Sequence, residues 1–212
     1  MSYTQQLSLP RLLKESVQLP TSTIGYSVIP DSTSILTDEA LACFDRANLE
    51  VFYSVLFVSP GHGGNLASRL IHTDASLMDK NGDRKSSWRK TICSINWELT
   101  NSIAEWHWWD LTSLPILYPK ALTLPPMSRH PGYEYLSGIH YGNEVKVGIP
   151  DGAKLIQTAK IDSIPTLVRT DVPHNIAFVM KNPAPFRAAI SIRFKESWQD
   201  WDEALIAFDS LK

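Results

Sequence analysis

Fourteen prolines are spread along the 212 residues of the chain, and the apolar residues between them fall mostly in short alternating runs. Proline breaks helices because it lacks a backbone N–H and clashes with the preceding turn, whereas strand ends and turns tolerate it. The chain therefore predicts a mainly β fold. Its length suits one domain with a sizeable core, so we expect a single domain over residues 1–212.

Strand-like alternation occurs in eight segments separated by loops that contain Gly, Pro or Asn. These segments are Leu49–Val58, Ala67–Asp74, Lys90–Leu99, Ala104–Leu111, Lys154–Lys160, Pro165–Thr170, His174–Met180 and Arg187–Phe194. Eight short strands predict a sandwich or a jelly roll, with its core over about 49–194. The Pro- and aromatic-rich segment 112–151 has the length of an insertion or lid.

Two helices are expected to flank these strands. The first begins at Thr37 or Asp38 and ends near Ala47, with an N-capping side chain and acids in its first turn. The second closes the chain over 197–211, with Ser197 as its cap. A helical stripe in it predicts that it covers one face of a sheet: Trp198, Trp201, Leu205 and Phe208.

Composition excludes several partners. The formal net charge is −2 and no basic run stands out, so we do not expect the protein to bind nucleic acid. No segment has the apolar length of a signal peptide or a membrane span, so we expect a cytoplasmic protein. Cys43 and Cys93 form no CxxC pair and are expected to be small buried hydrophobes.

The stretch "LIHTDASL" places a histidine and an aspartate two residues apart in a strand, where side chains at i and i+2 share one face. His174 follows 100 residues after Asp74, and Arg187 lies 13 residues further on. The two strands that begin at His174 and Arg187 flank the turn-like "KNPAP", which predicts a β-hairpin.

These residues resemble the pattern of the 2-oxoglutarate- and iron(II)-dependent oxygenases. The tail "PHNIAFVMKNPAPFRAAISIRF" is similar to the ending of their prolyl and aspartyl/asparaginyl hydroxylase-like members. The stretch "KTICSINWELTNS" followed by "AEWHWW" resembles the strand pair after their HxD motif. The resemblance covers about Arg69 to Phe194 and implies a double-stranded β-helix, a jelly roll like that of cupins, with flanking helices.

The resemblance also implies roles and a reaction. His72, Asp74 and His174 would be the catalytic iron(II) ligands, a facial triad that leaves open positions for a chelating cosubstrate and dioxygen. Arg187 would bind the far carboxylate of 2-oxoglutarate through charge-assisted hydrogen bonds. The implied activity hydroxylates an unactivated carbon of an amino-acid-like substrate, free or in a peptide, and converts 2-oxoglutarate to succinate and CO2. Asp74 favours hydroxylation, because related halogenases have a small residue there.

Further residues are candidates for the cosubstrate site. Ser191 shares a face with Arg187, although many family members place their serine two residues after the arginine, where this chain has Ala189. Asn96 lies on the more polar face of its strand and is expected to face the same interior. Arg193, 19 residues after His174, is an alternative carboxylate binder further along the strand.

Two other hypotheses about the function are compatible with the sequence. The chain would be a non-catalytic jelly-roll binding or structural protein if the histidines and Asp74 are solvated or hold a structural metal. It would be a cupin-type metalloenzyme that does not use an oxoacid cosubstrate if the metal site exists but no buried cation binds such a cosubstrate. The tryptophans of "EWHWWD" are expected mainly in the core, and the remaining histidines at the surface or the rim of the site: His62, His107, His130 and His140.

Overall fold

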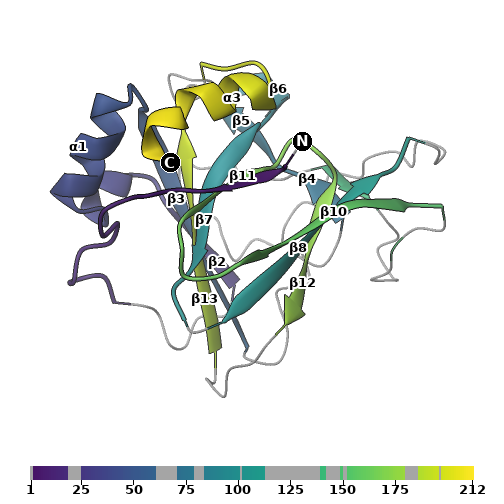
Figure 1. The fold of residues 1–212 in the computed structure, drawn as a ribbon, viewed down its shortest axis with the longest axis horizontal. Helices are drawn as coiled ribbons and strands as arrows, with labels where there is room; N and C mark the ends of the chain where they lie inside the picture. Colours follow the sequence, from purple (N-terminus) through teal and green to yellow (C-terminus); the bar gives the residue numbers. More distant parts are fainter. Residues whose placement is uncertain are drawn as a thin grey trace.

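The computed structural model of the protein describes residues 2–18, 25–60, 71–78, 84–100, 102–112, 139–141, 149, 152–179, 186–195 and 197–212. These residues form a mainly β structure with antiparallel strands (Figure 1). The strands are β1 (Thr4–Gln6), β2 (Gly25–Ile29), β3 (Val51–Pro60), β4 (Ile71–Thr73), β5 (Ala75–Met78), β6 (Arg84–Lys90), β7 (Cys93–Glu98), β8 (Ile103–Asp110), β9 (Ile139–Tyr141), β10 (Lys154–Ile161), β11 (Thr166–Arg169), β12 (His174–Val179) and β13 (Phe186–Phe194). The prediction of a mainly β fold is confirmed.

The strands pair into two large sheets and one small one. The six-stranded sheet has the order β1-β11-β7-β13-β3-β2, and the five-stranded sheet has the order β10-β8-β12-β4-β9. Strands β5 and β6 pair with each other. All eight predicted strands are present with ends shifted by a few residues, except that residues 67–70 of the second lie outside the described part of the chain.

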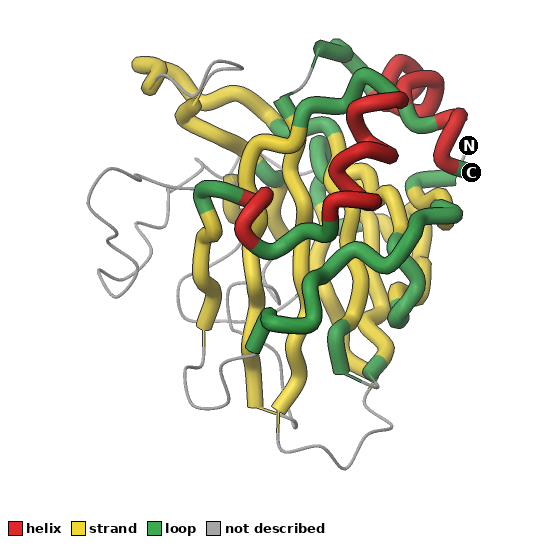
Figure 2. The backbone as a smooth tube through the Cα atoms, turned by 90° about the vertical axis from the view of Figure 1, so that its left-hand side faces the viewer, coloured by secondary structure: helices red, strands yellow, loops and turns green. Residues whose placement is uncertain are grey.

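The two helices among the described residues, α1 (Asp38–Arg46) and α3 (Trp201–Ala207), lie over the six-stranded sheet, on the side away from the five-stranded sheet (Figures 1 and 2). Helix α1 begins as predicted, because the Thr37 side chain accepts a hydrogen bond from the backbone N–H of Ala40 at 3.2 Å. Alternate residues of β7 and β13, among them Ile95 and Ile192, pack against these helices.

The closing helix is shorter than predicted. Helix α3 spans Trp201–Ala207 and is followed by a 3-10 turn at Asp209–Leu211, so the predicted start at Ser197 is wrong. Asp200 takes the capping role instead, because its carboxylate accepts from the backbone N–H of Glu203. The predicted packing role is confirmed: Trp198, Trp201 and Phe208 are buried in the core beneath the helices.

The predicted hairpin between the strands at His174 and Arg187 is wrong. Strand β12 lies between β8 and β4 in the five-stranded sheet, whereas β13 lies between β3 and β7 in the six-stranded sheet. Both edges of each strand are already paired, so the two strands face each other across the core instead of sharing hydrogen bonds. The turn "KNPAP" and most of the predicted insertion 112–151 fall outside the described residues.

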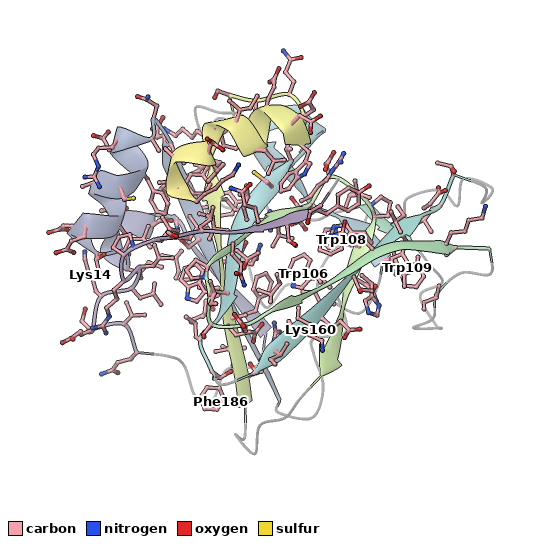
Figure 3. The ribbon with its side chains drawn as sticks, in the orientation of Figure 1. Lys14, Trp106, Trp108, Trp109, Lys160 and Phe186 are labelled. Atoms are coloured by element: carbon pink, nitrogen blue, oxygen red, sulfur yellow. The ribbon has the colours of Figure 1, made fainter. Side chains whose placement is uncertain are left out.

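Two interior walls face each other between the sheets. On β8, Trp106 and Trp108 point into this space (Figure 3), and both belong to a buried cluster with Val168 of the opposite sheet. On β13 the opposite wall carries Arg187, Ser191 and Arg193, since the alternate residues Ile190, Ile192 and Phe194 pack on the helix side. One wall of the interior is therefore aromatic and the other is polar.

Candidate metal and cosubstrate site

His174 is the buried centre of the candidate site. It begins β12, is 1% exposed, and stacks on Trp106 with 5.1 Å between ring centroids. Its Nδ1 lies 2.9 Å from the carbonyl oxygen of Val172, so this nitrogen donates the proton. Burial lowers the pKa of His174 below its usual value of 6.5, and this effect outweighs the negative charge of Asp74, which raises the pKa. The imidazole is thus neutral at pH 7 with its lone pair on Nε2, the form that binds metals.

Asp74 and His72 come to His174 from the neighbouring strand. The Cα atoms of His72 and His174 are partners in the antiparallel pair β4–β12, which places them roughly 4.5–5.5 Å apart. Asp74 follows β4, and its backbone N–H donates to the carbonyl oxygen of Thr170 at 2.9 Å. The structure therefore brings together the backbones of His72 and Asp74 with His174; the side chain of His72 is outside the described part.

The carboxylate of Asp74 accepts a hydrogen bond from Arg193. The Nη2 atom of Arg193 lies 2.6 Å from Oδ2 of Asp74, and the two side chains are 9% and 18% exposed. The sequence pattern makes Arg193 only an alternative to Arg187, because it lies further along the strand. It is the guanidinium beside the candidate metal ligands.

Arg187 lies at the other end of the same wall. It precedes Arg193 by six residues on the same face of β13, which amounts to about 20 Å of extended strand. Its Nε donates to Oε2 of Glu98 at 2.8 Å, and its Nη2 donates to Oε1 of the same carboxylate. Both side chains are almost fully buried. The structure thus separates Arg187 from the ligand residues and gives it a carboxylate partner of its own.

Ser191 and Asn96 lie side by side between these two ion pairs. They are Cα partners in the pairing of β13 with β7, and Thr166 continues the row on β11. Asn96 donates through Nδ2 to Oγ of Ser94 at 2.7 Å. The Oγ atom of Ser191 is completely buried and has no hydrogen-bond partner among the residues that the structure describes. A buried hydroxyl of this kind costs free energy unless a ligand or water oxygen completes it.

Sequence reasoning missed the role of Glu98 and the position of His140. Glu98 shares the predicted polar face of β7 with Asn96, a signal that could have pointed to a partner for Arg187. His140 in β9 is the Cα partner of His72, so His140, His72 and His174 occupy one row across three neighbouring strands. No local sequence pattern links His140 to this row, since it lies 68 residues after His72.

The remaining predictions concern the tryptophans of β8 and the other histidines. Trp106, Trp108 and Trp109 are all buried, which confirms their core role. His107 is partly exposed on the outer face of β8, where its Nε2 lies 2.7 Å from Oε1 of Glu105. His62 and His130 lie outside the described part of the chain.

The described side chains include no group of three His, Cys, Asp or Glu residues that would hold a metal by themselves. A neutral imidazole with a fixed Nδ1 proton and a nearby carboxylate are two donors of the kind that a metal takes, and the backbone of His72 lies beside them. None of the helices among the described residues has the length and apolar character to cross a membrane. Comparisons of the chain with protein-family models, with curated proteins and with solved structures found no match.

Proposed function

We propose that this protein is a cytoplasmic non-haem iron(II) enzyme that uses 2-oxoglutarate and dioxygen to hydroxylate an unactivated carbon of an amino-acid-like substrate, free or in a peptide. One observation carries the proposal: neutral, buried His174 lies in register with His72 and within reach of the charge of Asp74. Two imidazoles and one carboxylate are the ligand set of mononuclear iron(II) oxygenases.

The strand order supports a double-stranded β-helix as the scaffold. Along the chain, the strands pass between the two large sheets: β3 and β7 belong to one, β4 and β8 to the other, and β10 to β13 continue this exchange. A jelly roll is built from two Greek keys in this manner, and cupins use its interior for metal sites. The ligand residues would then lie on the inner face of the five-stranded sheet.

The residues have distinct tasks in this proposal. His72, Asp74 and His174 would hold the metal, which when bound supplies the oxidation chemistry. The bond from His174 Nδ1 to Val172 fixes the ring orientation and the tautomer. Trp106 and Trp108 form an apolar wall next to His174, and such a wall limits the access of water.

The polar wall supports a carboxylate site for the cosubstrate. The unsatisfied Oγ of Ser191 and the neighbouring amide of Asn96 offer hydrogen bonds to an oxoacid, and a guanidinium lies on each side of them along β13. Arg187 keeps the anchoring role that the resemblance implies only if its guanidinium, which Glu98 holds about 20 Å of strand from Arg193, is shared with the oxoacid or released to it; Arg193 beside Asp74 is the other candidate anchor.

A cupin-type metalloenzyme without an oxoacid is the second candidate. The bidentate pairing of Arg187 with Glu98 favours it, because an oxoacid enzyme needs a cation for its cosubstrate. The row of His140, His72 and His174 favours it as well, since a third histidine beside the two would suit a histidine-rich metal site.

Anaerobic addition of iron(II) and 2-oxoglutarate tests the proposal. We expect a visible charge-transfer band from the chelate, and we expect it to disappear in His174→Ala. The band should weaken in Ser191→Ala and in Arg187→Met, with the exposed Lys212→Met as a matched surface control. Absence of the band in the wild type, combined with metal binding that depends on His140, would favour the cupin-type enzyme instead. Succinate release screened over amino acids and peptides would then identify the substrate.

A further inference from the structure

Arg193 reaches a predicted metal ligand that lies 119 residues away in the sequence. Its Nη2 donates to Oδ2 of Asp74 at 2.6 Å, and both side chains are largely shielded from solvent. Charge-assisted bonds of this length are strong, and shielding from water strengthens the attraction further. One oxygen of the Asp74 carboxylate is therefore fixed by the protein.

A carboxylate can give a metal one oxygen or both. If Oδ2 stays with Arg193, Asp74 can ligate through Oδ1 alone, because two-oxygen ligation would break the ion pair. A one-oxygen ligand matters in a facial triad, since a chelating oxoacid occupies two positions and dioxygen needs a third. Resting on the function proposed above, we propose that Arg193 is a positioning residue that keeps Asp74 a one-oxygen ligand and so preserves the position that the oxoacid needs.

The charge of Arg193 would also suit a different role, and two oxoacids of different structure distinguish the two roles. Arg193 would bind the far carboxylate of 2-oxoglutarate if it served the cosubstrate directly. The compound 2-oxobutanoate chelates a metal through the same carboxylate and ketone and has no far carboxylate. A residue that acts through Asp74 affects both oxoacids equally, whereas a residue that binds the far carboxylate affects 2-oxoglutarate alone.

The experiment makes two measurements on the full chain. The first is its affinity for Mn(II). The second is the affinity of the iron(II)-loaded protein for each oxoacid, measured under anaerobic conditions from the chelate band. The variants are Arg193→Gln, which removes the bond, and Arg193→Lys, which keeps a donor. Lys195→Gln is the matched control, because it removes the same charge two residues further along, where the partner is Glu50 at the surface. We expect Arg193→Gln to retain Mn(II) binding and to lose about tenfold or more in affinity for both oxoacids. Arg193→Lys and Lys195→Gln should resemble the wild type.

Three outcomes would overturn this assignment while the proposed function stands: unchanged affinity for both oxoacids, a loss confined to 2-oxoglutarate, or loss of Mn(II) binding in parallel with the oxoacids. A wild type that binds neither metal nor oxoacid would refute the proposed function and this inference together. X-ray absorption of the iron(II)-loaded wild type provides a test without any variant. An iron-to-carboxylate-carbon distance typical of two-oxygen ligation would contradict the proposal, and one typical of single-oxygen ligation would support it.

Discussion

Breaking the ion pair of Arg187 and Glu98 should strongly destabilise the protein. The side chains are 6% and 1% exposed, and Glu98 also accepts a hydrogen bond from Ser102 Oγ at 2.7 Å. Removing one partner of a buried pair costs about 3–5 kcal/mol, because the other charge is left uncompensated. For Glu98→Gln we therefore expect a loss of about 3–5 kcal/mol in the free energy of unfolding. In a chain of this size that loss lowers Tm by roughly 6–20 °C.

Urea unfolding in the presence of a chelator measures this loss without a contribution from bound metal. The double variant Glu98→Leu/Arg187→Met removes both charges, and we expect it to fall within about 1–2 kcal/mol of the wild type, since apolar replacement of a whole buried pair is often neutral. The single variants Glu98→Leu and Arg187→Met form with this double variant a cycle that isolates the coupling between the two side chains. A cost below about 1 kcal/mol for Glu98→Gln, or additive single variants, would refute the buried-pair argument.

Three further perturbations test other parts of the structure. Ser191→Ala should raise the stability of the metal-free protein by about 1–3 kcal/mol in urea unfolding, because it removes an unsatisfied buried hydroxyl, while it weakens the 2-oxoglutarate chelate band. Trp201→Ala should cost about 3–5 kcal/mol in the same assay, since the indole is 1% exposed in the core under the helices. Burial lowers the pKa of His174 below 6.5 in the folded protein. Below pH 6.5 the imidazole is therefore protonated more readily in the unfolded chain than in the folded one. Stability of the metal-free protein should be complete above about pH 6.5 and fall as the pH drops toward the folded-state pKa, which a Tm series compared with His174→Gln would detect.

Local patterns predicted the elements well. The alternation in the sequence located all eight proposed strands, and it placed Asn96 on the face of β7 opposite Ile95, which packs against the helices. The Thr37 cap predicted where α1 begins, because capping depends only on residues within one turn. The short strands β1, β2 and β9 and the pair β5–β6 were missed, since three to seven residues give little periodicity to detect.

Pairing between distant residues could not be predicted in the same way. Proximity in sequence favoured a hairpin between β12 and β13, yet each strand pairs with strands that come much earlier in the chain. The same reason explains why the carboxylate partners of the two arginines were not predicted, because Glu98 and Arg187 are 89 residues apart and Asp74 and Arg193 are 119 apart. Side-chain periodicity placed both arginines on one face but carried no information on which carboxylate each would meet.

The polar wall has a charge balance that bears on the order of ligand binding. Among its described side chains, Arg187 is matched by Glu98 and Arg193 by Asp74, while Asn96 and Ser191 between them are uncharged. A divalent metal alone would add two positive charges to this shielded interior, and an oxoacid dianion alone would add two negative charges. Either addition is unfavourable at low dielectric, whereas the two together cancel. We therefore expect 2-oxoglutarate to bind the metal-free protein at least about tenfold more weakly than the Mn(II)-loaded protein, and linkage requires the oxoacid to tighten Mn(II) binding by the same factor. Calorimetric titration in both orders measures the two factors, and equal affinity with and without Mn(II) would contradict the charge-balance argument.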